Sequence, residues 1–104
     1  MIDAAQISDI RRYLKRAWIP FFGRFGKLTP VQLAAIPKVL NGINVVIASP
    51  TASGKTEAVV APVAECFIKD NWSNLAVIYI VPTRALANDS LARIEGPLLD
   101  MGIT

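Results

Sequence analysis

The stretch NVVIASPTASGKT, residues 44–56, decides the fold of this chain. It begins with an apolar run, continues through a polar turn and ends in Gly-Lys-Thr, which is the second half of a phosphate-loop signature. This order is typical of a buried strand, a phosphate loop and the first turn of a helix. We therefore predict a strand over 44–48 and a helix from about 54 to 70.

The loop carries the residue types that bind nucleotide phosphates. Gly54 lets the backbone approach a phosphate closely, Lys55 supplies a positive charge, and the Thr56 hydroxyl can bind Mg²⁺. Lys55 and Thr56 are the candidate catalytic residues, although Ser49 stands where the signature has its first glycine. The predicted phosphate-binding set, which uses inward-facing amides and the positive end of the helix, is Thr51, Ala52, Ser53, Gly54, Lys55 and Thr56.

The composition fits one small domain. The 104 residues are 53% hydrophobic, yet no apolar run reaches the roughly 18 residues of a membrane span. No signal-peptide pattern is present either, so we expect a cytoplasmic protein without membrane contact. Cys66 is the only cysteine and histidine is absent, which excludes an internal disulfide and a cysteine–histidine metal site. We expect Cys66 to be buried and unreactive.

Positive charge is concentrated at the beginning of the chain. The net charge is +3, and the first 27 residues carry six basic side chains against two acidic ones. These are Arg11, Arg12, Lys15, Arg16, Arg24 and Lys27 against Asp3 and Asp9. Such a segment can attract the phosphate backbone of a nucleic acid, or it can be the solvated face of a helix. Charge alone leaves both alternatives open.

Two helices are predicted before the phosphate loop. Residues 7–18 place Ile7, Ile10, Leu14 and Trp18 (or Ala17) at helical spacing, and Pro20 should end this helix and begin a loop over 20–28. The second helix has Thr29 as its N-cap, Pro30 at its first position and Gln32 completing a capping box. Asn41-Gly42 should terminate it.

A second strand is predicted over 75–81, where the chain is apolar throughout. Thr83 should cap a final helix that Gly96-Pro97 interrupts, with Leu86, Ala87, Leu91 and Ile94 facing inward. Two strands joined by a helix form one parallel βαβ unit, and two parallel strands do not make a stable sheet. The chain is therefore expected to be part of a larger α/β domain, with 1–28 as a basic leading segment and 29–104 as the nucleotide-binding portion. Its exposed apolar faces predict self-association.

Three stretches together resemble the superfamily 2 helicases of DEAD/DEAH-box type. Residues 25–32 resemble the Q motif, 48–56 resemble motif I, and 81–87 resemble motif Ia. The Gly-Lys-Thr-Glu-Ala run at 54–58 is more similar to the large helicase-related and Ski2-like branches than to the strict DEAD-box branch. This resemblance implies an α/β fold: a partial RecA-like P-loop NTPase domain with parallel strands and crossover helices, preceded by two helices.

The resemblance also implies roles for individual residues. Gln32 would read the adenine edge of ATP, or it simply closes the capping box. Thr83 and Arg84 would hold a nucleic-acid backbone; the alternatives are N-capping for Thr83 and an exposed charge for Arg84. Phe25 would stack on the base or pack in the core.

The implied function is an ATP- and Mg²⁺-dependent helicase or translocase that acts on DNA or RNA together with a second RecA-like domain. The family's Asp-Glu pair, which holds Mg²⁺ and positions water, does not occur among these residues. We therefore expect the 104 residues alone to bind nucleotide without hydrolysing it. The alternatives are another P-loop protein, either a kinase-like enzyme or a non-enzymatic nucleotide-binding module.

Overall fold

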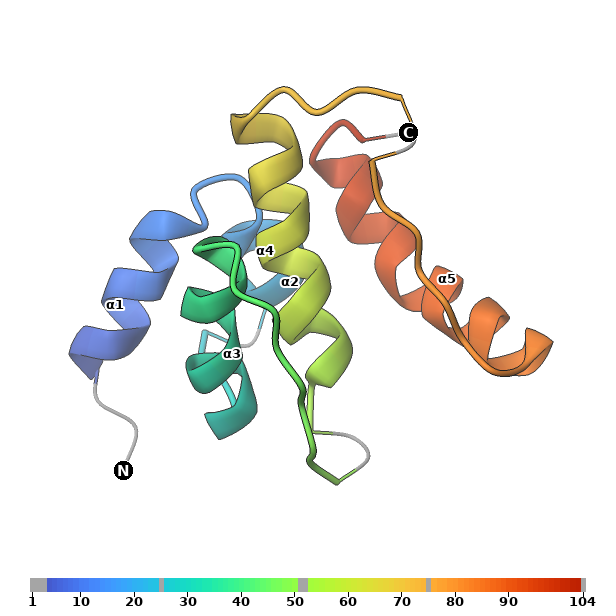
Figure 1. Ribbon diagram of the computed structural model, residues 1–104. Helices are drawn as coiled ribbons and strands as arrows, with labels where there is room; N and C mark the ends of the chain where they lie inside the picture. Colours follow the sequence, from blue (N-terminus) through green and yellow to red (C-terminus); the bar gives the residue numbers. More distant parts are fainter. Residues whose placement is uncertain (1–3, 25, 51–52, 75, 104) are drawn as a thin grey trace.

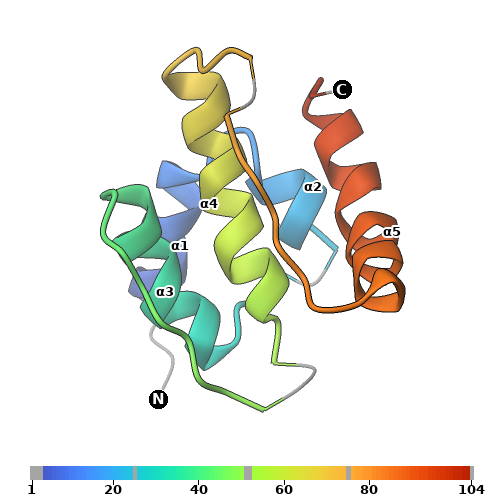
Figure 2. The same ribbon diagram turned by 45° about the vertical axis from the view of Figure 1, so that its right-hand side comes forward.

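The computed structural model describes residues 4–24, 26–50, 53–74 and 76–103, and the regular structure in these ranges is helical (Figure 1). The helices are α1 (Ala4–Tyr13), α2 (Trp18–Phe22), α3 (Pro30–Leu40), α4 (Lys55–Lys69) and α5 (Arg84–Asp100). Helix α4 lies at the centre, with α1 and α3 on one side and α5 on the other (Figure 2). Helix α2 contacts both α4 and α5, so the phosphate-loop helix is the element around which the others pack.

The amphipathic helix predicted over 7–18 is divided into two helices. Its apolar face is confirmed at Ile10, Leu14 and Trp18, which are buried, whereas the side chain of Ile7 lies outside the described residues. The division arises because the main-chain N–H groups of residues 16 and 17 donate to Glu65 of α4 rather than to helical carbonyls. The prediction that Pro20 ends the helix and begins a loop over 20–28 is wrong at its start, because Pro20 lies inside α2 and the helix continues to Phe22. A missing N–H in the first turn of a helix costs nothing.

Helix α3 forms as its capping residues predict. Thr29 has an extended backbone (φ −76°, ψ 161°), and its hydroxyl accepts from the Gln32 N–H. The Gln32 side chain accepts in turn from the Thr29 N–H at 2.9 Å, which completes the capping box. Asn41 caps the other end, as expected. The first turn of this helix is therefore stabilised by its own residues, independently of the phosphate loop.

The hydrophobic core lies between the N-terminal helices and α4. Leu14, Phe22 and Ile36 are among its most buried side chains, and the Trp18 and Phe22 rings pack with their centroids 5.5 Å apart. The α4 side of the core is built from small residues at helical spacing, namely Ala58, Ala61 and Ala64. Small side chains let neighbouring helices approach closely, which explains why the side chains of α3 can reach the phosphate loop.

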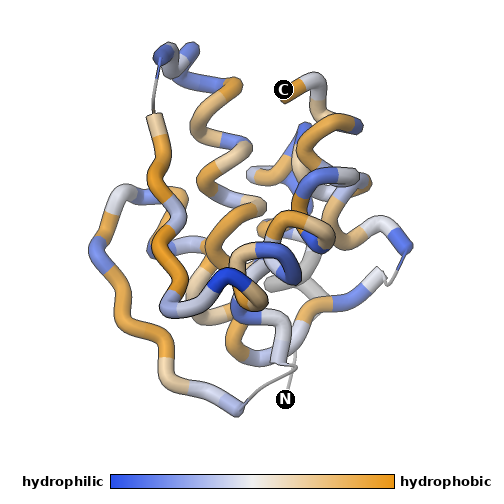
Figure 3. Tube along the Cα trace, turned by 90° about the vertical axis from the view of Figure 1, so that its right-hand side faces the viewer, coloured by the Kyte–Doolittle hydropathy of each residue, from blue (hydrophilic) through white to orange (hydrophobic). Residues whose placement is uncertain are grey.

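The two predicted strands do not form in the described residues, so the predicted sheet is not confirmed. Residues 43–50 and 76–82 form two extended segments without strand pairing. Both segments run in the same direction, opposite to α4 (Figure 1). They stay apart, and a strand gains its stability from a paired neighbour. Both segments are largely apolar and lie along one side of the helices (Figure 3). Val46 is 95% exposed and Ile80 86% exposed. The chain therefore follows the path of a βαβ crossover, but no sheet forms in the described residues.

Helix α4 agrees with its prediction, whereas α5 does not. The first runs from Lys55 to Lys69 with Gly54 and Asp70 as its caps. The second continues through Gly96-Pro97 instead of stopping there, because one proline removes a single helical hydrogen bond without ending the helix. Contrary to the prediction, Leu86, Ala87 and Leu91 are exposed, and only Ile94 of the predicted inward set is half-buried. No described α5 residue is fully buried.

None of the helices in the described ranges combines the length and hydrophobicity that a bilayer crossing requires.

Candidate functional site

Gly54 begins the candidate site as the N-cap of α4, and Lys55 and Thr56 form the first turn. Gly54 adopts φ +83°, in the left-handed region that L side chains avoid. A Cβ atom at this position would also collide with Nε2 of Gln32. The backbone conformation thus requires glycine here, and a larger residue would also displace the Gln32 amide from the loop. Thr51 and Ala52, the other predicted loop contacts, lie outside the described residues.

The phosphate loop is closed by hydrogen bonds between its own residues. Lys55 Nζ donates to the Ser49 carbonyl oxygen at 2.6 Å. The Ser49 and Ser53 hydroxyls share a hydrogen bond of 2.7 Å. Ser49, which replaces the first glycine of the signature, therefore contacts Ser53 and Lys55 at the other end of the loop. The lysine ammonium has three N–H donors, so a phosphate that enters the loop can bind Lys55 beside the Ser49 carbonyl or in its place.

Helix α3 is fastened to this loop through its first turn. Gln32 Nε2 donates to the Gly54 carbonyl at 3.2 Å, and Thr29 Oγ1 donates to the Ser53 carbonyl at 2.8 Å. Gln32 is 6% exposed, so its amide sits among these partners with little access to water. The capping role is confirmed, and the same side chain also holds the loop. The adenine contact stays a prediction.

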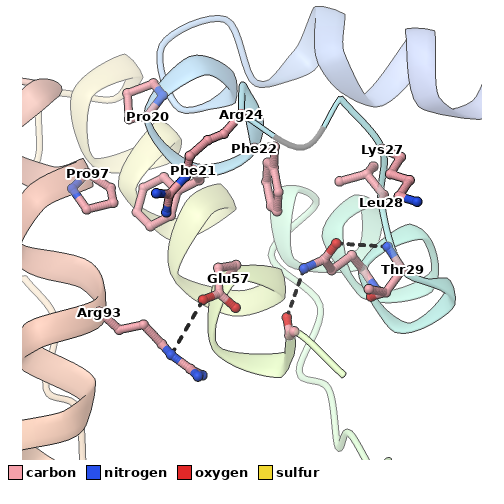
Figure 4. A pocket seen from close by; sticks show the side chains of 12 residues that line it. Pro20, Phe21, Phe22, Arg24, Lys27, Leu28, Thr29, Glu57, Arg93 and Pro97 are labelled. Carbon is pink, nitrogen blue, oxygen red and sulfur yellow. Dashed lines mark hydrogen bonds and ion pairs between the residues drawn. The ribbon is translucent and has the colours of Figure 1, made fainter. Parts of the chain in front are cut away.

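A cavity of about 520 Å³ lies beside Gln32 (Figure 4). Its wall combines α2, the chain before α3, the first turn of α4, and α5. Among its residues are Phe21, Phe22, Arg24, Glu57 and Arg93, none of which the sequence had indicated as part of a nucleotide site. Arg93 Nε lies 3.9 Å from a Glu57 carboxylate oxygen. Because these residues come from separate helices, no local motif could have revealed them.

A second cavity, of about 660 Å³, lies on the Lys55 side of the same loop. It is lined by Gly54, Lys55 and Thr56 together with Leu86, Asp89, Ser90, Ala92 and Arg93 from α5. The two cavities share Gly54 and Arg93 and therefore adjoin at the phosphate loop. Each has a volume typical of small-molecule sites.

The donor set of the second cavity suits a magnesium–phosphate group. Lys55 provides the cation, and the Thr56 hydroxyl and Asp89 carboxylate provide hard oxygen ligands. Within the described ranges no cluster of three or more potential metal-binding side chains occurs. Mg²⁺ is commonly held by one or two protein groups plus substrate phosphates. The site therefore fits Mg²⁺ that arrives with a nucleotide.

The two residues predicted to contact nucleic acid lie at the beginning of α5. Thr83 caps this helix, since its Oγ1 accepts from the Leu86 N–H at 3.1 Å. Arg84 is exposed. Neither residue lines the two cavities, so the candidate strand-binding site is separate from the phosphate loop. The capping role of Thr83 is confirmed, and its contact with a backbone phosphate stays a prediction.

Part of the positive charge in the leading segment is used within the protein. Arg12 pairs with Asp9, and Arg16 Nη1 lies 2.9 Å from a Glu65 carboxylate oxygen. The Arg11 guanidinium carbon lies 5.9 Å from the centre of the Trp18 ring. The Arg12–Asp9 pair lies within α1, whereas the Arg16 and Arg11 contacts lie at the corner between α1 and α2. Nucleic-acid binding by the leading segment stays a prediction.

Comparisons with known proteins show the family of this chain. A family model described as DEAD/DEAH box helicase matches residues 29–103. The ATP-dependent helicase Lhr-Core protein 2 of Thermococcus barophilus is 40% identical over 101 residues, which cover 92% of this chain and 12% of that protein. The ATP-dependent rRNA helicase SPB4 of Encephalitozoon cuniculi is 46% identical over 66 residues, covering 61% of this chain and 14% of that protein.

A second archaeal relative, ATP-dependent helicase Lhr-Core of Saccharolobus solfataricus, is 35% identical over 101 residues, or 92% of this chain and 11% of that protein. The chain thus spans a small fraction of the length of the relatives it matches. No solved structure matches it. By its family model and by these identities, the chain belongs to the DEAD/DEAH box helicase family.

Proposed function

We propose that these residues form the ATP-binding segment of a RecA-like motor domain in an ATP-dependent nucleic-acid helicase or translocase. The observation that carries the proposal is the contact between Gln32 and Gly54. It places a side chain able to select a base at the junction between a cavity with aromatic walls and a cavity that holds Lys55 and Thr56. A base, a sugar and a phosphate chain need such an arrangement.

In this proposal the adenine occupies the cavity beside Gln32 and the phosphates occupy the one beside Lys55. The Gln32 amide has two N–H groups and two carbonyl lone pairs. The two hydrogen bonds described here use one of each. A base edge can therefore be bound without releasing the phosphate loop. Lys55 would neutralise outer phosphate charge, the loop amides and Thr56 would complete the phosphate site, and Thr56 would bind the accompanying Mg²⁺.

The proposed strand contact is the beginning of α5, through Thr83, Arg84 and the free amides of the first turn. Such contacts bind phosphates independently of base sequence. Hydrolysis also needs acids that place the metal and the attacking water, and no adjacent Asp-Glu pair occurs in this sequence. We assign nucleotide and strand binding to these residues, and hydrolysis to a complete motor with a second RecA-like domain.

The match to the DEAD/DEAH box helicase family disfavours the kinase-like alternative. The phosphate-loop signature alone would allow it, but the Thr-Pro-x-Gln block at 29–32 has no role in a nucleotide kinase. In the structure, this block is joined to the loop by two hydrogen bonds. A non-enzymatic binding module differs from the helicase proposal in one measurable respect, which is strand-stimulated ATP hydrolysis.

The Lys55→Ala substitution tests the nucleotide site in the protein at its natural full length. Losing a hydrogen bond to a charged group costs about 1.5–3 kcal/mol, so we expect affinity for Mg-ATP to fall by roughly ten- to a hundredfold and strand-stimulated hydrolysis to stop. Lys69→Ala, which removes an exposed cation from the other end of the same helix, is the control. Unchanged affinity in Lys55→Ala would contradict the phosphate site, and absence of hydrolysis in the unmutated protein would favour the binding module.

The Arg84→Ala substitution tests the strand contact. The slope of log affinity against log salt concentration should become shallower by about one when one phosphate contact is lost. Lys38→Ala removes an exposed cation from α3 and should leave the slope unchanged. An equal slope in all three proteins would remove Arg84 from the proposed contact. Single-stranded DNA and RNA of the same length, measured side by side, would identify the preferred strand.

A further inference from the structure

Glu65 is a buried carboxylate whose function the nucleotide site does not yet explain. It lies on α4 and is 2% exposed. Its Oε1 accepts from the main-chain N–H of Arg16 at 2.8 Å and of Ala17 at 3.0 Å, and its Oε2 accepts from Arg16 Nη1 at 2.9 Å. One side chain thus holds a corner of backbone nearly fifty residues away in sequence. A buried charge is tolerated only with such partners.

These contacts supply the cap that α2 lacks in its own sequence. Ala17 is the N-cap residue of α2, and its side chain has no acceptor to offer. Glu65 binds the N–H of Ala17 and that of the preceding residue in its place. The position and direction of α2 therefore depend on a residue of α4.

Helix α2 forms part of the base cavity. Phe21 and Phe22 line the cavity beside Gln32, and Figure 4 shows their rings on its wall. Glu65 belongs to the same helix as Lys55 and Thr56, almost three turns further along. A single helix thus carries the phosphate-binding residues at its beginning and the support for the aromatic wall near its end. A change in the position of α2 would therefore change the shape of the base cavity relative to the phosphate loop.

We propose that Glu65 is a positioning residue for the nucleotide base: it fixes the α2 wall of the base cavity relative to the phosphate loop. The inference rests on the proposed nucleotide site. Base-dependent affinity depends on Glu65, whereas phosphate-dependent affinity does not, because Lys55 and Thr56 reach the phosphates without α2. No contact between Glu65 and the nucleotide is involved.

The test compares two ligands in the protein at its natural full length. Mg-ATP contains base and phosphates, whereas magnesium tripolyphosphate contains the phosphates alone. In Glu65→Leu we expect the dissociation constant for ATP to rise about tenfold while that for tripolyphosphate changes less than about twofold. Asp100→Asn, which neutralises an exposed carboxylate on α5, should change neither constant. Equal weakening of both ligands, or of neither, would overturn the inference.

Two milder variants keep the test decisive if Glu65→Leu does not fold. Glu65→Gln retains Oε1 for the two amides and replaces Oε2 with a donor that faces Arg16. Arg16→Met keeps the carboxylate and both amide contacts and removes the guanidinium alone. Each should weaken ATP more than tripolyphosphate, by a smaller factor than Glu65→Leu. Identical ATP-to-tripolyphosphate ratios in these variants and the unmutated protein would reject the positioning role.

Failure of this inference is distinguishable from failure of the proposed function. If the unmutated protein bound neither ligand, the nucleotide site itself would be wrong. If it bound both and Glu65→Leu weakened both equally, Glu65 would only stabilise the fold and the nucleotide site would stand.

Discussion

Lys55 and Ser49 are joined across the phosphate loop by a hydrogen bond of 2.6 Å from the lysine Nζ to the serine carbonyl oxygen. The Ser49 hydroxyl makes a second bond, of 2.7 Å, to Ser53. The residue that replaces the first glycine of the signature thus stabilises a closed loop. Nucleotide therefore meets a loop in which the Ser53 and Lys55 side chains already have partners within the protein.

Removing the Ser49 hydroxyl should make the loop easier to open. A typical hydrogen bond contributes about 1 kcal/mol net, so in Ser49→Ala we expect Mg-ATP affinity to rise by about two- to fivefold. The free energy of unfolding should fall by a similar amount. Both quantities can be measured by nucleotide titration and by denaturant unfolding. Weaker ATP binding in Ser49→Ala would mean that the hydroxyl is needed in the bound state.

The two functions of Gln32 can be separated by substitution. Gln32→Glu keeps an oxygen to accept from the Thr29 N–H but loses the donor to the Gly54 carbonyl, whereas Gln32→Ala loses both. We expect Gln32→Ala to lower the free energy of unfolding by about 1–2 kcal/mol and Gln32→Glu to lower it less.

Both Gln32 variants should reduce the preference for ATP over GTP, measured by competition between the two nucleotides. Equal use of both by the unmutated protein would remove the adenine role from Gln32 and leave the capping and loop contacts intact.

Gly54 and Gly96 provide a matched pair of glycine substitutions. At Gly54 an alanine must adopt φ +83° and collide with the Gln32 side chain. We expect Gly54→Ala to cost about 2–3 kcal/mol of stability. Gly96 lies within α5 with open space around it, and Gly96→Ala should stabilise the helix by about 0.5–1 kcal/mol. Thermal unfolding of the two variants measures both effects. Stability changes of the same sign in both variants would contradict the special geometry of Gly54.

Cys66 is half-buried rather than buried. Burial raises the pKa of its thiol, and the nearby Asp70 carboxylate raises it further. In the unfolded chain the thiol ionises at lower pH, so its contribution to stability is present at neutral pH and is lost as the pH rises through the folded pKa.

The free energy of unfolding should therefore fall in the alkaline range by an amount that is absent in Cys66→Ala. Native Cys66 should also react with iodoacetamide more slowly than the unfolded chain at pH 8. Identical alkaline profiles for the two proteins would contradict the raised pKa.

Local chemistry in the sequence predicted the beginnings of α3 and α4 well. Thr29, Pro30 and Gln32 begin a helix by contacts within one turn, and a left-handed glycine before Lys55 begins the next. The Gln32 contact with the phosphate loop could not be read in this way, because it joins residues from two elements. The break between α1 and α2 could not be predicted for the same reason, because it depends on contacts between Ala17 and Glu65 of α4.

The remaining disagreements concern contacts that only a neighbour can supply. The apolar runs at 44–48 and 75–81 have strand-like composition, but a strand forms only where a second strand pairs with it. Likewise, Leu86 and Leu91 have helical spacing for a buried face, yet nothing in the described structure covers them. Composition predicted which residues are suited to burial; it does not determine whether a partner is present.

The exposed apolar side chains of the two extended segments affect the heat-capacity change on unfolding. Val46 and Ile80 are already almost fully in contact with water in the folded state, so unfolding hydrates little additional surface there. The heat-capacity change on unfolding and the denaturant m-value both scale with newly exposed area. The isolated chain should therefore melt with a smaller heat-capacity increment and a shallower denaturant dependence than other domains of about 100 residues.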